Sequence, residues 1–262
     1  MKTVIAIAAH PDDIELMMAG TLLQLQKAGY EIHYMNLSRG DCGSQEYSPA
    51  QTKKIRLAEA KDAAKILGAH FHPPFCNDLE ILYDVKTLKR VAAIIREVKP
   101  SIVLTHSPED YMEDHTNTGR LAVTAAFARG MRNFTTIPQV EYDNYNCTIY
   151  HSLPHTLKDG FRRNIIPGTF VNTAPVHNIK MEALKAHKSQ QNWLDVSQKM
   201  NSYLLAMDDI SLMVGRMSEV FTHAEGWRRH LHVGFCEADD DPLKDLGADY
   251  RINEAFEKKL QG

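Results

Sequence analysis

The chain has 262 residues, of which 44% are hydrophobic and 24% charged, and its formal net charge at pH 7 is −3. That length is enough for one large α/β domain or for a domain with a substantial C-terminal extension, and the composition is ordinary for a soluble globular protein. The slightly acidic charge excludes the basic footprint of nucleic-acid or anionic-membrane binding. No stretch approaches the roughly 20 apolar residues of a membrane span, and the four cysteines form no Cys-x-x-Cys pair. We therefore expect a cytoplasmic protein with no nucleic-acid or membrane partner.

Residues 4–9 form a short apolar, partly β-branched run, which predicts a buried parallel strand. Pro11 ends this strand, because proline keeps the residue before it out of helical geometry and cannot extend a ladder. Residues 15–26 carry regularly recurring leucines and predict a helix. His10, Asp12 and Asp13 therefore lie where a strand ends and a helix begins, the edge at which open α/β sheets bind ligands.

This His-Pro-Asp-Asp turn carries the donors of a catalytic metal site. An imidazole and a carboxylate are two of the three protein ligands that a catalytic zinc uses, with a fourth position left for water. Neighbouring turn residues point in different directions, so one aspartate can reach the metal while the other faces the water as general base. Helix capping is the competing interpretation for either aspartate alone, but it does not explain the four residues together after a buried strand.

Strand and helix signals alternate through the rest of the first half. We expect, in order, a strand at 31–37, a polar loop at 38–44, a helix at 49–67, a strand at 69–72, a helix at 85–98, a strand at 102–105, a polar loop and a helix at 116–129. This alternation predicts a Rossmann-like, mostly parallel sheet flanked by helices, with right-handed crossovers.

The second half is less regular and predicts an α+β extension. The expected strands are 148–152, 168–171 and 220–224, and the expected helices are 179–188, running on into 190–194, and 204–214. We predict a single domain over 1–262, with the Rossmann-like part at about 1–137 and the C-terminal extension at about 138–262.

A third metal ligand is expected from the end of a neighbouring strand. His115 fits, because it follows the strand at 102–105 and precedes a helix, and Asp114 beside it is placed to orient its imidazole. His106, nearer the end of that strand, is the competing candidate. Most of the other histidines are interpreted as surface or packing residues, namely His33, His70, His72, His177, His223, His230 and His232.

Residues 9–15, Ala-His-Pro-Asp-Asp-Ile-Glu, match every fixed position of the A-H-P-D-D-x-E motif of the LmbE-like, or PIG-L, family of zinc-dependent deacetylases, which the chain resembles. Residues 110–115 are similar to the family's second motif, which ends in H-x-D-H. The resemblance implies three metal ligands, namely His10, Asp13 and His115. It also implies Asp12 as the general base and Asp114 as the partner that supports His115.

Further segments extend the resemblance over nearly the whole chain. Residues 56–60 resemble the family's R-x-x-E-A helix, residues 186–190 its H-x-S-Q segment and residues 224–227 its A-E-x-F/W segment. The resemblance implies that Arg56 and Asp78 bind the sugar. From the residues alone, a surface salt bridge for Arg56 and a turn cap for Asp78 are the simpler interpretations.

One position departs from the family pattern. Met112 stands where the first histidine of H-x-D-H is expected, a residue that the resemblance assigns to stabilising the oxyanion or protonating the leaving amine. Methionine has no proton to donate. The side chains that we consider as substitutes are Tyr111, His151, His155 and His187.

The resemblance implies a carbon–nitrogen hydrolase that acts on a linear amide and removes an N-acetyl group from an N-acetylglucosamine-type sugar or glycoconjugate. Zinc is the expected metal, although two imidazoles and one carboxylate also bind Fe²⁺, Ni²⁺ and Co²⁺. The family's frequent trimers and hexamers imply a homo-oligomer. The expected partner is a small-molecule or oligosaccharide N-acetylated sugar.

Three other functions compete with this one. A metallophosphoesterase needs additional ligands, often a bridging carboxylate, to hold two metals, whereas only one set of three is well formed here. A catalytically weak sugar-binding relative is suggested by Met112. A nucleotide-binding Rossmann protein is disfavoured, because the first turn lacks G-x-G-x-x-G and its two carboxylates would repel a pyrophosphate.

Overall fold

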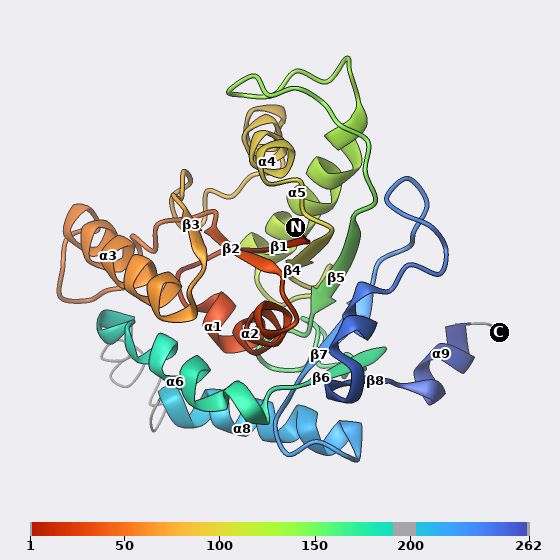
Figure 1. Ribbon diagram of the computed structural model, residues 1–262. Helices are drawn as coiled ribbons and strands as arrows, with labels where there is room; N and C mark the ends of the chain where they lie inside the picture. The colour runs from red at the N-terminus through yellow and green to blue at the C-terminus, as the bar shows by residue number, and fades with distance from the viewer. Residues whose placement is uncertain (1, 191–202, 261–262) are drawn as a thin grey trace.

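The computed structural model describes residues 2–190 and 203–260 (Figure 1). Its strands are β1 (Thr3–Ala8), β2 (Glu31–Asn36), β3 (His70–His72), β4 (Ile102–Thr105), β5 (Thr148–Ser152), β6 (Thr169–Asn172), β7 (Ala224–Arg229) and β8 (Tyr250–Ile252). Its helices are α1 (Asp13–Met17), α2 (Ala19–Lys27), α3 (Pro49–Leu67), α4 (Val85–Val98), α5 (Glu113–Phe127), α6 (His177–Lys185), α8 (Tyr203–Ser218) and α9 (Glu254–Leu260). None of these helices is long and apolar enough to cross a membrane.

The strands form one eight-stranded sheet in the order β3-β2-β1-β4-β5-β7-β6-β8. The five strands from β3 to β5 are parallel, whereas β7, β6 and β8 add in antiparallel pairs. The predicted α/β fold with a mostly parallel sheet and flanking helices is confirmed. Because β5 is still parallel to β4, the parallel part of the sheet continues past Pro138, where we expected it to end.

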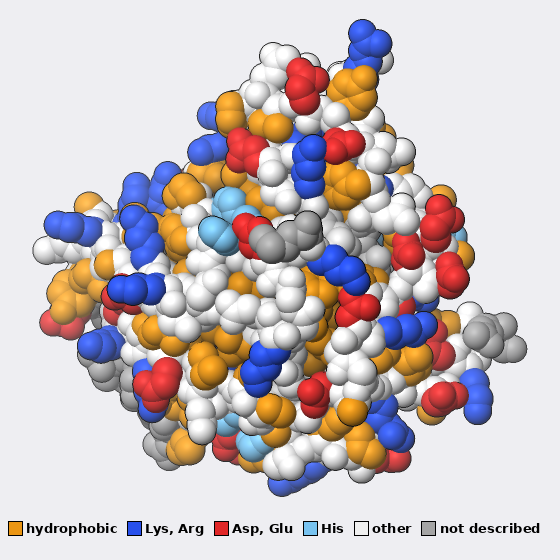
Figure 2. All heavy atoms as spheres, in the orientation of Figure 1, with side chains coloured by type: hydrophobic (Ala, Val, Ile, Leu, Met, Phe, Trp, Pro, Cys, Tyr) orange, Lys and Arg blue, Asp and Glu red, His pale blue; other side chains and the backbone are white. Residues whose placement is uncertain are grey.

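Helices cover both faces of the sheet, so β1 is buried on both sides (Figure 1). One hydrophobic cluster joins Val4, Ala6 and Ala8 to α2, α3, α6 and α8, and the other joins Ile5 and Ile7 to α4 and α5. Successive strand residues face opposite sides, which explains why this strand reads as a continuous apolar run. Acidic and basic side chains are interspersed over the face shown in Figure 2.

The predicted helix at 15–26 is divided into α1 and α2 at Met18, whose φ of −135° is not helical. The start of α2 is held by Glu225 of β7, whose carboxylate accepts hydrogen bonds from the amides of Gly20 (2.8 Å) and Thr21 (2.7 Å). A carboxylate at a helix N-terminus satisfies amides that lack partners within the helix. The C-terminal half thus fixes the helix that follows the His-Pro-Asp-Asp turn.

The predicted strand at 220–224 is wrong, because β7 begins at Ala224. The hydroxyl of Ser218, at the end of α8, accepts hydrogen bonds from the amides of Val220 (3.3 Å) and Phe221 (2.9 Å). These bonds form a turn, which occupies the donors that a strand ladder would need.

Glu225 also neutralises a fully buried lysine. Its Oε1 lies 2.8 Å from Lys180 Nζ, and the two side chains are 2% and 0% exposed. We expect Glu225→Ala to lower the free energy of unfolding by about 3–5 kcal/mol, because it leaves a buried charge unpaired. Urea denaturation measures this loss, and Glu182→Ala, which removes an exposed ion pair with Lys185, should change stability little. Equal effects of the two variants would contradict the prediction.

Candidate metal centre and active site

The turn between β1 and α1 is held by polar groups of its own residues and of the neighbouring strand β2. Asp12 takes a left-handed conformation (φ 99°), which is strained for a residue with a side chain. Asp13 Oδ2 accepts a hydrogen bond from the His10 amide at 2.7 Å, and Asn36 Nδ2 donates to the His10 carbonyl at 2.6 Å. The turn therefore holds the side chains of His10 and Asp13 at the carboxyl edge of the sheet.

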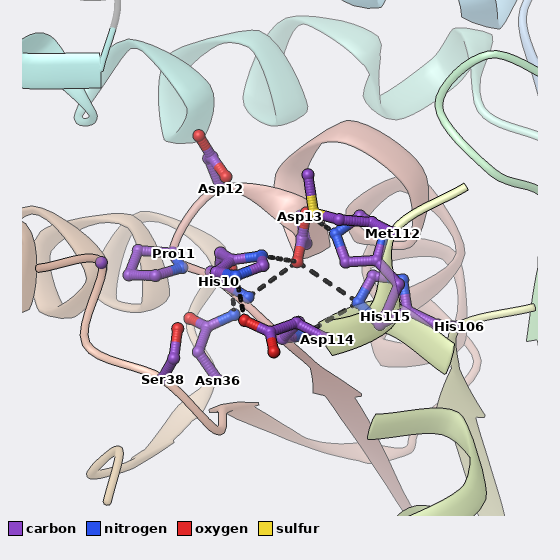
Figure 3. A network of polar contacts seen from close by, with 12 residues as sticks. His10, Pro11, Asp12, Asp13, Asn36, Ser38, His106, Met112, Asp114 and His115 are labelled. Atoms are coloured by element: carbon purple, nitrogen blue, oxygen red, sulfur yellow. Dashed lines mark hydrogen bonds and ion pairs between the residues drawn. The ribbon is translucent and has the colours of Figure 1, made fainter. Parts of the chain in front are cut away.

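His10, Asp13 and His115 converge, as the sequence predicted, with one donor atom from each within 4.8 Å of the others (Figure 3). Asp13 Oδ2 lies 3.5 Å from His10 Nδ1, and Asp13 Oδ1 lies 3.4 Å from His115 Nε2. His115 comes from the first turn of α5, which begins at Glu113 and so takes in residues that we expected in a loop. All three side chains are buried or nearly so.

Each of the two imidazoles also contacts a second carboxylate, through the nitrogen that does not face Asp13. For His115 this carboxylate is not Asp114, the residue that we predicted. Asp114 Oδ2 lies 3.0 Å from His10 Nε2 and also accepts a hydrogen bond from the Leu79 amide. His115 Nδ1 lies 3.2 Å from Asp110 Oδ2 instead. The expectation that Asp114 orients His115 is therefore wrong, because adjacent residues of α5 point in different directions. Asp110 was missed because its position depends on the path of a loop.

The carboxylates make this pocket favourable for positive charge. Burial alone lowers the pKa of His10, but Asp114 and Asp13 outweigh it and raise that pKa to about 9. Burial also lowers the pKa of His115, but Asp13 and Asp110 outweigh this effect and raise that pKa to about 10. The pKa of Asp13 is held well below its usual value, against the effect of burial, by the surrounding histidines.

His106, the competing ligand candidate, is already engaged by the backbone. Its Nε2 accepts a hydrogen bond from the Ala9 amide at 2.9 Å, and its ring stacks on His115 with 4.1 Å between centroids. Burial and the neighbouring His115 lower the pKa of His106 to about 4. A second possible donor group does include it, with Asp110 and His115. The contacts nevertheless favour His106 as a support for the His115 ring.

The donors present fit a divalent cation. Both nitrogens of His115 are buried and lack a well-aligned hydrogen bond among the described residues, although Asp13 lies 3.4 Å from Nε2 and Asp110 lies 3.2 Å from Nδ1. In both His10 and His115, one ring nitrogen faces Asp13 and the other faces a second carboxylate, Asp114 for His10 and Asp110 for His115. That is the arrangement in which outer carboxylates orient histidine ligands. Two imidazoles and one carboxylate suit Zn²⁺, and also Fe²⁺, Co²⁺ and Ni²⁺.

Asp12 lies beside this group but points away from it (Figure 3). Its Oδ2 is 3.3 Å from Arg56 Nη2, and Arg56 also donates to the Pro11 carbonyl. Burial raises the pKa of Asp12 above its usual value although Arg56 opposes this. The role of Asp12 as general base stays a prediction.

Arg56 and Asp78, the predicted sugar-binding residues, are connected through the loop after β2. Asp78 Oδ1 accepts hydrogen bonds from Ser38 Oγ and the Gly40 amide, both at 2.8 Å, and Oδ2 accepts from the Cys42 amide. A Cβ added to Gly40 would lie 2.6 Å from the Arg56 side chain, so glycine lets the loop close over that residue. Asp78 thus holds the loop, and the sugar-binding role of both residues stays a prediction.

The structure separates the four substitutes considered for Met112. His155 Nε2 lies 3.4 Å from Asp13 Oδ1, and the Tyr111 ring meets His115 edge-on at 6.1 Å between centroids. His151 instead contacts the His106 carbonyl at 2.7 Å. His187 lies 3.4 Å from Glu15, a buried carboxylate of α1. His155 and Tyr111 are therefore the two candidates that reach the ligand side chains.

Comparison with known proteins relates this chain to a family of deacetylases. The family described as PIG-L: GlcNAc-PI de-N-acetylase matches residues 5–126. Diacetylchitobiose deacetylase of Thermococcus kodakarensis is 32% identical over 235 residues, which cover 87% of this chain and 83% of that protein. The 4-oxalmesaconate hydratase of Pseudomonas putida is 33% identical over 132 residues, or 47% of this chain and 51% of that protein.

Among solved structures, N,N'-diacetylchitobiose deacetylase from Pyrococcus horikoshii superposes with a TM-score of 0.72 at 23% identity, covering 92% of this chain and 88% of that one. This likeness establishes the shared fold. With the 32% identity to a relative matched over 83% of its length, the chain belongs to the PIG-L, or LmbE-like, deacetylase family.

Proposed function

We propose that this protein is a metal-dependent hydrolase that removes an N-acetyl group from an N-acetylglucosamine-type sugar or oligosaccharide. The observation that carries the proposal is the buried convergence of His10, Asp13 and His115 within 4.8 Å at the carboxyl edge of the sheet. A relative that is 32% identical is named a diacetylchitobiose deacetylase, which supports an N-acetylated sugar as the substrate.

Three side chains would hold the ion, namely His10, Asp13 and His115. When bound, a divalent ion would polarise the amide carbonyl and acidify a water. Asp114 and Asp110 keep the two imidazoles oriented. Asp12 accepts a proton from the attacking water and passes it to the departing amine. For this role its carboxylate must turn from Arg56 toward the ligand side chains when substrate binds.

The proposal is tested by release of free amine and acetate from a panel of N-acetylated mono- and oligosaccharides. We expect equal amounts of both products from the zinc-loaded protein, loss of release with a chelator and recovery when zinc is restored. Sugar binding without turnover by the fully metallated protein would favour the non-catalytic alternative. Phosphate release from phosphomonoesters with two metals per chain would favour the phosphoesterase.

Met112 offers a second test of the chemistry. In Figure 3 its side chain is drawn beside the candidate metal centre, with its sulfur above Asp13 in this view. We expect Met112→His to raise kcat for amide hydrolysis about 10-fold or more, because it adds a proton donor beside the reacting amide. Met112→Leu, which keeps an apolar side chain of similar size, should leave kcat nearly unchanged. If both variants are slower than the wild type, methionine is part of a pocket that already has its donor.

A hydratase is the second candidate function. An activated water can also add across a conjugated double bond, its hydroxide to one carbon and its proton, carried by Asp12, to the other. This reaction has no amine to protonate, and Met112 removes the donor that amide hydrolysis is expected to use. A relative that is 33% identical over 132 residues is named 4-oxalmesaconate hydratase. Loss of ultraviolet absorbance from conjugated unsaturated polycarboxylic acids, without amine release from any sugar, would favour this function.

The finer expectations of a cytoplasmic location and of a homotrimer or homohexamer stay predictions. Light scattering coupled to size-exclusion chromatography would give the mass of the assembly. A monomer at micromolar concentration would contradict the oligomer that the family resemblance implies.

A further inference from the structure

A second cluster of histidine and carboxylate side chains shares no residue with the candidate metal centre. His177 is the first residue of α6, Asp208 lies in α8, and His223 directly precedes β7. From the sequence we interpreted both histidines as surface or packing residues. We propose instead that His177, Asp208 and His223 form a second divalent-cation site, of the class that binds Zn²⁺.

The three donor atoms are already close to the spacing that zinc needs. Asp208 Oδ1 lies 2.9 Å from His177 Nε2 and 3.0 Å from His223 Nε2, and all three donors lie within 4.8 Å of one another. Bonds of about 2.0–2.1 Å around a tetrahedral zinc place its ligand atoms roughly 3.3 Å apart. A small outward movement of the three side chains would therefore seat an ion between them.

The surroundings also suit a cation with open coordination positions. The side chains of His177, Asp208 and His223 are 13%, 31% and 18% exposed, so water and ions have access. Lys180, on the next turn of α6, does not leave a free positive charge there, because its Nζ is paired with Glu225.

An ion at this position would connect three segments that are far apart in the sequence. The helices α6 and α8 contact each other, and α8 packs along β7 (Figure 1). Since metal binding to a folded site adds to folding stability, the ion would stabilise the C-terminal half. The competing interpretation is a carboxylate that accepts hydrogen bonds from two neutral imidazoles, which predicts no stabilisation by metal.

The test uses His115→Gln as the parent protein, because His115 belongs to both possible donor groups of the candidate metal centre, so the change leaves the second cluster as the remaining intact group among the described residues. After removal of metal with a chelator, zinc is titrated by calorimetry and the bound metal is counted by mass spectrometry. We expect about one zinc per chain in the parent and at least tenfold weaker binding after adding His223→Gln. Glutamine keeps an N–H donor for Asp208, so the metal-free Tm should change little.

Asp208→Asn provides an independent variant, and His232→Gln is the matched histidine control. We expect zinc to raise the Tm of the parent and of the His232→Gln protein, but not of the His223→Gln or Asp208→Asn proteins. Equal zinc binding by the parent and by His223→Gln, or a parent that binds no zinc, would overturn the proposal. The deacetylase activity of His223→Gln in the otherwise wild-type chain should be unchanged, so failure here is distinguishable from failure of the proposed function.

Discussion

Asp13→Asn is expected to lose bound metal and to reduce amine release to background. The two oxygens of Asp13 meet the imidazoles of His10, His106, His115 and His155 at 3.2–3.5 Å, and one of them accepts the hydrogen bond of the His10 amide. Asparagine has nearly the same shape and keeps one acceptor. What it removes is the negative charge in the middle of the histidines, which is the charge that would neutralise a divalent cation.

The measurement is zinc content after equilibrium dialysis, alongside amine release from the best sugar of the panel. Asp114→Asn is the graded comparison, because it changes the partner of His10 without removing a ligand. We expect that variant to lose about 10–100-fold in metal affinity. An Asp13→Asn protein that keeps full metal content at wild-type affinity would show that the ligand set has been assigned wrongly.

Asp12→Asn is expected to keep its metal and to lose about 10²–10⁴-fold in kcat, the usual contribution of a positioned general base. Asparagine cannot accept the proton of the attacking water. The variant should fold, since asparagine tolerates the left-handed backbone that Asp12 adopts (φ 99°). Single-turnover amine release at matched zinc content isolates the chemical step from product release.

Arg56→Gln tests whether Asp12 acts as the general base or only holds the Arg56 side chain in place. Asp12 Oδ2 lies 3.3 Å from Arg56, so its carboxylate could serve only to hold that guanidinium in place. In that case the two variants should lose activity equally. If Asp12 is the base, its substitution lowers kcat far more, whereas Arg56→Gln acts chiefly on KM, as expected of a residue that orients the sugar.

Local signals in the sequence were enough to predict many of the elements and where the turn lies. The helices α3 and α4 and the strand β4 have the predicted bounds. Their ends carry residue-level causes, such as the side chain of Asp84, which accepts the Thr87 amide at 2.8 Å and caps α4. Local signals also predicted the turn at residues 9–15, because a strand, a proline and a helix in succession place His10 and Asp13 at the carboxyl edge of the sheet.

Only the tertiary structure decided which side chains face one another. Asp114 supports His10, although it is adjacent to His115 in sequence, and Asp110 takes the position behind His115. Such pairings depend on the rotation of α5 and on the path of the preceding loop, which no local pattern specifies. The division of the first helix at Met18 has the same origin, since the carboxylate that caps α2 arrives from β7, about 200 residues later in the chain.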